Sequence, residues 1–260
     1  MNASKFFLKA ANSLVTAIVA LFLILAAAYS GYALWDNAQV YGAVDDIQSQ
    51  LLKLKPDPEQ KDGGTSFEEL RKINPDVCGW ITLDHTKIDY PILQGEDNLT
   101  YINTDVYGDF ALSGSIFLDS GCDRNFRGKY SLLYGHHMAE HKMFGDLDLY
   151  RKKKFFNKST TGTLILPDRS YKLEIFACMQ VSASEESIFA TGKWQADTSG
   201  LVDFVRKTRN MSISRQWITL EVRRFFPDTG NVNLLFGIYR CKNSSSGGNE
   251  TLFAGDVRRG

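Results

Sequence analysis

Two neighbouring histidines stand at the end of a short apolar run in the middle of the chain. Leu132–Tyr134 reads as the end of a buried strand, and Gly135 would permit a sharp exit from it. His136 then lies at the end of a sheet. Because imidazole titrates near neutral pH, a histidine positioned there could act as an acid or a base. The alternative is a histidine in a surface turn.

A metal site is the first rival interpretation of the same stretch. His137 and His141 stand four residues apart and would share one face of a helix. Glu140 lies between them, but the zinc-protease order His-Glu-x-x-His is absent, and Gly135 favours a loop. We therefore predict no metal and no cofactor.

The spacing of the cysteines matches no redox or zinc-binding pattern. None of them belongs to a closely spaced pair, as redox or zinc sites require: Cys78, Cys122, Cys178 and Cys241. Cys178 falls inside an apolar strand, where a small buried thiol is the usual occupant. Cys241 stands between two basic residues, which could lower its pKa.

Composition describes an ordinary folded protein with an attachment. The chain has 260 residues, of which 43% are hydrophobic and 23% charged, and 30 basic residues balance 30 acidic ones. This balance gives no electrostatic case for binding nucleic acid. Partners must be inferred from the site.

The N-terminal segment predicts a membrane anchor. Leu14–Leu34 is uncharged and long enough to cross a hydrocarbon layer of about 30 Å as a helix. Lys5 and Lys9 precede the span and Asp36 follows it, which places the N-terminus in the cytoplasm and the remainder outside. A cleaved signal peptide is the alternative, because Ala26–Ala28 supplies small residues, but the apolar run is longer than such peptides use.

The rest of the chain divides by composition. Residues 1–36 form the cytoplasmic start and anchor. Residues 37–64 give a juxtamembrane helix with apolar Val44, Ile47 and Leu51, then a linker rich in proline and glycine. Residues 65–241 form the main domain, and residues 242–260 are a polar tail.

The main domain reads as mainly β. Turn residues separate short apolar runs at the spacing of an all-β barrel or sandwich: 77–83, 88–93, 115–118, 131–134, 162–166, 171–181, 217–220 and 232–239. Helical segments are expected at 67–73, ending before Pro75, and at 200–209, and residues 147–156 are expected to form a helix or a turn.

Four motifs in order resemble class B sortases, which are membrane-anchored cysteine transpeptidases of Gram-positive bacteria. They are the segments 74–81, 88–95, 114–119 and 134–138, the last followed by Met143 and Phe144. The similarity spans roughly residues 66 to 220. It implies an eight-stranded sortase-type β-barrel with a few helices, preceded by a single transmembrane helix.

The resemblance also implies the reaction and its partners. A thiolate attacks a backbone carbonyl in the C-terminal sorting signal of an exported protein, and an amine from a cell-wall precursor or a pilin resolves the thioester. His136 matches the family's imidazole. An arginine would stabilise charge on the carbonyl oxygen. The enzyme would be a single-pass protein of the cell membrane with its catalytic domain outside.

Two of the three catalytic groups are missing from their expected places. Thr219 and Leu220 begin the family's nucleophile motif, but Arg223 occupies the position of the cysteine. Asn233, or less closely Asn231, occupies the position of the arginine. Three explanations stay open: a degenerate sortase that binds without turnover, a shift of reading frame after about residue 220, and an unrecognised catalytic residue. We predict impaired activity for the chain as written.

Substrate contacts are predicted from the same resemblance. Asn98 and Tyr101, in the loop 95–101, and Tyr134 would line the groove for the peptide. The alternative function is a non-catalytic surface module that holds extended peptides in that groove.

Overall fold

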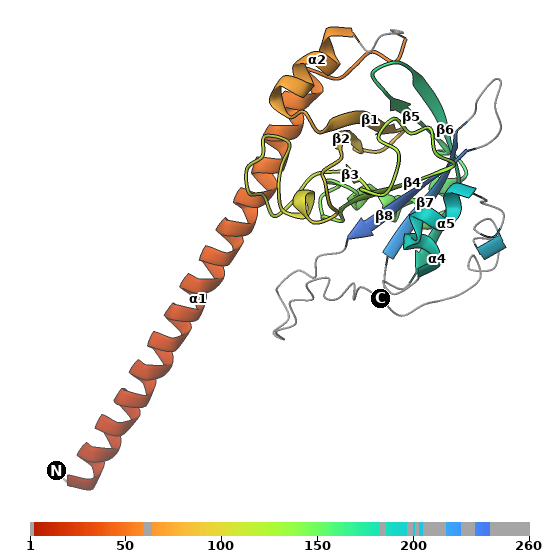
Figure 1. The fold of residues 1–260 in the computed structure, drawn as a ribbon. Coiled ribbons are helices and arrows are strands. Elements are labelled where there is room, and N and C mark those ends of the chain that lie inside the picture. Colours follow the sequence, from red (N-terminus) through yellow and green to blue (C-terminus); the bar gives the residue numbers. More distant parts are fainter. Residues whose placement is uncertain are drawn as a thin grey trace, which may run out of the picture.

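The structure is a computed structural model that describes residues 3–59, 64–181, 186–196, 200, 203–204, 217–224 and 232–239. A curled β-sheet forms the main body, and one long helix projects from it (Figure 1). The predicted architecture, mainly β and of the sortase type with a few helices, is confirmed.

Helix α1 spans Ala3–Leu52 without interruption. Its described stretch Phe6–Leu52 is long and apolar enough to cross a membrane, with a mean hydropathy of 2.3 in its most apolar window. Large apolar side chains between residues 6 and 35 are exposed, as a lipid-facing helix requires. The predicted division at residue 36 therefore falls inside one continuous helix.

The strands follow the apolar runs of the sequence. Their bounds are β1 Val77–Leu83, β2 Asp89–Leu93, β3 Phe117–Leu118, β4 Tyr130–His136, β5 Thr161–Ile165, β6 Ser170–Val181, β7 Trp217–Arg224 and β8 Val232–Tyr239. Each overlaps a predicted run, because apolar, β-branched and aromatic residues recur in these segments and turn residues separate them.

Short helices connect the strands. They are α2 Gly64–Ile73, η1 Thr100–Ile102, η2 Gly145–Arg151, α3 Lys153–Phe156, α4 Glu186–Phe189 and α5 Thr191–Ala196. Helix α2 ends before Pro75 as predicted, since the residue before a proline disfavours the helical conformation. Most of the helix predicted at 200–209, and the whole tail 242–260, lie outside the described residues.

The pairing of the strands decides which residues meet. Hydrogen-bonded neighbours follow the order β1-β2-β3-β4-β8-β7-β6-β5, and β1 also pairs with β5. Strand β8 runs parallel to β4, whereas β7 runs antiparallel to β8. The C-terminal end of β7 therefore lies level with the N-terminal end of β4.

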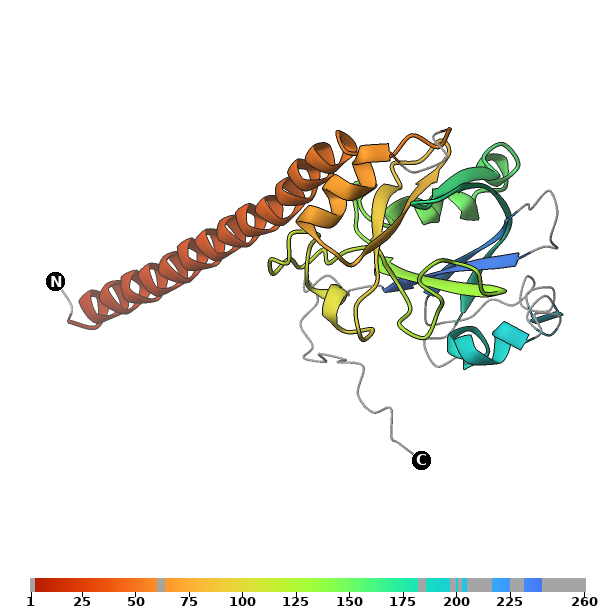
Figure 2. The same cartoon turned by 45° about the horizontal axis from the view of Figure 1, so that its top comes forward.

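The core fills the inside of the curled sheet and reaches the end of α1. Trp80, Phe126 and Tyr130 are among its largest fully buried side chains, and Val44 and Leu51 of α1 join the same cluster. The C-terminal end of α1 thus packs as part of the main domain, and Figure 2 shows it beside α2 and the sheet.

Candidate active site

Strand β4 delivers His136 to the end of the sheet, and its glycine acts by packing. Every residue of β4 is buried, and the strand continues through His136. A Cβ atom on Gly135 would lie 2.3 Å from a side-chain carbon of Ile116 and 2.8 Å from one of Phe144. The expected sharp exit at Gly135 is therefore wrong: glycine is required there because neighbouring side chains occupy the space.

The imidazole of His136 is buried and hydrogen-bonded. The residue is 3% exposed, and its Nε2 atom lies 2.6 Å from the carbonyl oxygen of Ile102 in η1. A carbonyl only accepts, so Nε2 carries the proton. Burial lowers the pKa of His136 below its ordinary value, and the bond to Ile102 opposes that shift in part. The imidazole is consequently neutral at pH 7 with its proton on Nε2.

The loop after His136 folds back onto it. The backbone N–H of Phe144 donates to the carbonyl of His136 at 2.9 Å, and His137 bridges to Met143. Glu140, His141 and Met143 have positive φ angles, which non-glycine residues adopt at a cost. Contacts from outside the loop must therefore hold it in place.

The two histidines considered for a metal take separate carboxylates. Nε2 of His137 lies 2.8 Å from Asp148, and Nδ1 of His141 forms a short contact with Asp146. Within the ranges that the structure describes, no group of three or more histidine, cysteine or acidic side chains is arranged to hold a metal.

Asn98 and Tyr134 meet at a buried carboxylate. The amide of Asn98 and the hydroxyl of Tyr134 each donate to Oδ2 of Asp119 at 2.8 Å. Oδ1 of Asp119 accepts from the N–H of Gly121 at 2.9 Å and from Thr191 at 3.3 Å. Asp119 is 5% exposed, so these bonds compensate for burying its charge. It fastens the loop 95–101 and helix α5 to strand β4, a role that its type and spacing did not reveal.

Tyr101 lies apart from this group. It is 4% exposed, accepts from the amide of Asn74 at 3.1 Å, and donates to Asp76 at 2.8 Å. Burial, followed by the bond to Asp76, raises the pKa of Tyr101 to about 12. The hydroxyl of Tyr101 thus joins the loop 95–101 to the residues that precede β1.

Arg223 and Asn233 pair with each other at the far end of the sheet from His136. In the strand register, Asn233 of β8 also lies opposite Tyr130 at the start of β4. His136, at the other end of β4, lies opposite Tyr239. Six residues along β4 correspond to roughly 20 Å. The structure does not bring the two predicted positions to the imidazole, because β8 lies between β4 and β7 and β7 runs the opposite way.

The cysteines among the described residues are protected by burial. Burial raises the pKa of the thiols of Cys78, Cys122 and Cys178 to about 12 in each case. Thiolate is the reactive form, so these three side chains are poor nucleophiles at neutral pH. Cys241 lies outside the described residues, two positions after Tyr239 in the sequence.

Comparison with known proteins identifies the fold and the family. No family model matches the chain. Sortase B of Listeria monocytogenes is 29% identical over 187 residues, covering 70% of this chain and 74% of that protein. Sortase B of Staphylococcus aureus is 28% identical over 174 residues, covering 67% and 70%.

Solved structures agree. A class B sortase of Streptococcus pyogenes involved in pilus biogenesis is 35% identical, with a TM-score of 0.53 and coverage of 67% of this chain and 97% of that one. A mutant form of Clostridium perfringens sortase B is 26% identical, with a TM-score of 0.57 and coverage of 74% and 94%. The chain belongs to the class B sortases, a family of cysteine transpeptidases.

Proposed function

We propose that this sortase acts on the C-terminal sorting signal of exported proteins and that its turnover is impaired as written. The family reaction starts when a thiolate attacks the scissile carbonyl carbon. The C–N bond breaks, the leaving amine takes a proton from an imidazolium, and a thioester remains. An acceptor amine then attacks the thioester, gives a proton to the imidazole and displaces the thiolate.

His136 is the proposed imidazole. Protonating a leaving amine requires its charged form, and burial disfavours that form. A thiolate partner would stabilise the imidazolium by its opposite charge. Loss of the thiol therefore removes the nucleophile and also the group that would keep His136 charged.

The observation that carries the impairment is the placement of thiols in the described part of the chain. Cys78 and Cys122 are buried in the core, and Cys178 pairs with Leu220 in the interior of the sheet. The sequence resemblance puts Arg223 in the nucleophile's place, although the strand register sets it at the opposite end of β4 from His136. Guanidinium stays protonated and cannot attack a carbonyl.

The proposed partners and location follow from the family and from helix α1. Substrates are exported proteins with a sorting signal, and the acceptor is an amine of a cell-wall precursor or of a pilin, as the pilus role of the Streptococcus pyogenes relative favours. Helix α1 supports a single-pass anchor, and Lys5 and Lys9 before it support a cytoplasmic N-terminus.

A cleavage assay on the full-length chain in lipid nanodiscs tests the impairment. The substrates are fluorogenic peptides carrying the sorting signals of the Listeria and Staphylococcus relatives, triglycine is the acceptor, and Staphylococcus aureus sortase B is the positive control. We expect no cleavage above background. Cleavage that iodoacetamide abolishes, and that Cys241→Ala also abolishes, would overturn the proposal and identify Cys241 as the nucleophile.

A non-catalytic peptide-binding module is the second candidate. It is favoured because no thiol in the described part of the chain has the properties of a nucleophile. Fluorescence polarisation with the same peptides separates the two candidates. A module binds the peptide equally well in His136→Ala and never forms a thioester, whereas an enzyme accumulates a thiol-linked adduct detectable by mass spectrometry.

A further inference from the structure

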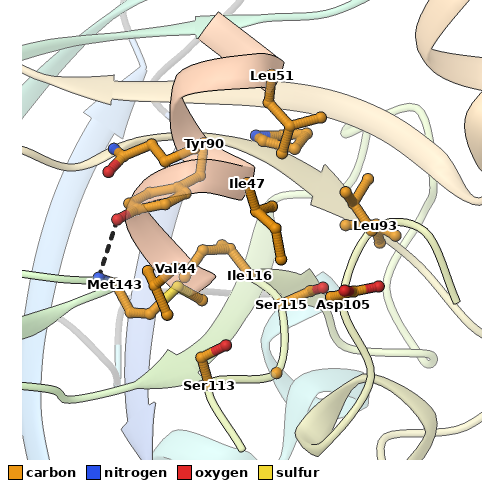
Figure 3. Close-up of a pocket in the computed structure, with 14 residues that line it drawn as sticks. Val44, Ile47, Leu51, Tyr90, Leu93, Asp105, Ser113, Ser115, Ile116 and Met143 are labelled. Atoms are coloured by element: carbon orange, nitrogen blue, oxygen red, sulfur yellow. Dashed lines mark hydrogen bonds between the residues drawn. The ribbon is translucent and has the colours of Figure 1, made fainter. Parts of the chain in front are cut away.

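The last turns of α1 pack against strand β2, next to the loop 137–144 that follows His136. Val44 and Leu51 are 4% and 3% exposed, and they face Tyr90 and Leu93 of β2 across a small apolar pocket (Figure 3). The amide of Gln48 donates to the carbonyl of Lys87 at 3.0 Å. The helix is thus fixed by apolar and polar contacts together.

One of the side chains under the helix contacts the loop directly. Tyr90 is 5% exposed, and its hydroxyl accepts from the backbone N–H of Met143 at 3.0 Å (Figure 3). Met143 is one of the loop residues with positive φ, and the next residue, Phe144, donates to the carbonyl of His136. The contact sequence therefore runs from the helix through Tyr90 to the histidine.

A second contact is electrostatic. Lys142 is 5% exposed, and its ammonium forms a short ion pair with Asp45 of α1, whose own side chain is 63% exposed. A buried ammonium is costly unless it is paired, so the loop conformation that buries Lys142 depends on Asp45. Surface pairs contribute little, but here one partner is almost wholly removed from water.

We propose that the C-terminal end of α1 positions His136, in addition to its proposed role in membrane anchoring. It does so through the ion pair of Asp45 with Lys142 and through its packing on Tyr90 of β2. The loop 137–144 carries backbone strain that it cannot support alone, and α1 supplies both the charge and the cover that stabilise it. Asp45 and Lys142 are positioning residues: they touch no substrate and act through the loop. This role of the helix rests on His136 being the proposed imidazole.

Hydrogen exchange by mass spectrometry on the full-length chain in nanodiscs tests the proposal without requiring turnover. In Asp45→Asn we expect peptides covering 138–144 to exchange roughly tenfold faster, because one partner of the pair is left buried and unpaired. Peptides covering β1 should exchange at the wild-type rate. Asp45→Glu keeps the charge and should restore protection. Asp46→Asn, at the exposed neighbouring position on the same helix, is the matched control and should change the rate less than twofold.

A double substitution separates positioning from general destabilisation. Asp45→Asn combined with Lys142→Met removes both charges, so it should exchange more slowly than Asp45→Asn alone. The titration of His136, followed through exchange of its ring C2 proton, should move toward its ordinary pKa in Asp45→Asn as water reaches the ring. Equal rates in Asp45→Asn and Asp46→Asn, or a double variant that exchanges as fast as Asp45→Asn, would overturn the proposal. Since none of these readouts needs cleavage, a failure of the proposed function would leave them unchanged.

Discussion

The Nε2 atom of His136 and the carbonyl oxygen of Ile102 lie 2.6 Å apart, which joins the end of β4 to the short helix η1. The two residues are 34 positions apart in the chain. The bond fixes the ring orientation and the tautomer of His136, because a hydrogen bond to one ring nitrogen decides which nitrogen carries the proton. The backbone around Ile102 therefore belongs to the site.

Gly114 allows its own segment to lie close to the backbone of Tyr101 and Ile102, which positions the Ile102 carbonyl. Its φ is +53°, and a Cβ atom there would lie 2.2 Å from the oxygen of Ile102. We expect Gly114→Ala to lower the free energy of unfolding by roughly 3 kcal/mol through strain and displacement of η1. Gly108→Ala is the control, because Gly108 also has a positive φ, +88°, but an added Cβ would meet no atom within 4 Å. Gly108→Ala should lower the free energy of unfolding, measured with urea, by about 1 kcal/mol. Equal losses would show that the crowding at Ile102 is unimportant.

His136 makes stability depend on pH. Burial lowers its pKa in the folded state below the unfolded value, so the unfolded chain binds more protons as pH falls. This stability is fully present above the unfolded pKa of about 6.5 and is lost as pH falls from there toward the folded pKa. Urea unfolding between pH 7.5 and 5 should show a smaller loss in His136→Gln than in wild type. An identical loss in both proteins would mean that the imidazole is not buried in its neutral form.

Asp119 should contribute more to the free energy of unfolding than a carboxylate on the surface does. Asp119→Asn keeps the shape but replaces one acceptor oxygen by a donor, which would face the donors at Tyr134, Asn98 or Gly121. We expect a loss of about 2–3 kcal/mol in the free energy of unfolding. Asp109→Asn, at an exposed position, should change it by less than about 0.5 kcal/mol. A similar small effect at both positions would contradict the role of Asp119 as a shared acceptor.

The strand register makes a prediction about restoring the family's catalytic residues. Arg223→Cys together with Asn233→Arg should not produce cleavage of a sorting-signal peptide, because the pair lies at the opposite end of β4 from His136. The same assay as above measures it, with circular dichroism confirming that the variant is folded. A gain in thiol-dependent cleavage would show that β7 brings residue 223 to His136 in the working enzyme.

Local patterns predicted the elements of this fold well. Val77–Leu83 is a strand over the predicted range, because a short, nearly continuous apolar run flanked by turn residues leaves few alternatives. The order and direction of β4, β8 and β7 could not be read in this way. Pairing between distant strands depends on contacts that no single segment encodes, so the distance between His136 and Arg223 became visible only in the structure.

The site was predictable in part. The position of His136 at the end of a strand followed from its sequence neighbours, but Gly135 was interpreted as a turn residue when it is a packing residue. Tyr101 was predicted from the family resemblance to line the peptide groove, and its burial and its bond to Asp76 could not be read from the sequence. Asp45 and Lys142 carried no sequence signal, since a charge on a helix and a charge in a loop are usually both solvated.

The unbroken course of α1 fixes the spacing between its apolar stretch and the sheet. Between Trp35, at the end of the apolar stretch, and Val44, where the helix joins the core, nine residues of helix rise by roughly 13 Å. With the proposed anchor in a bilayer, a stiff helix of that length, rather than a flexible linker, would separate the sheet from the lipid surface. Polypeptides presented to His136 would then have to bridge the same gap.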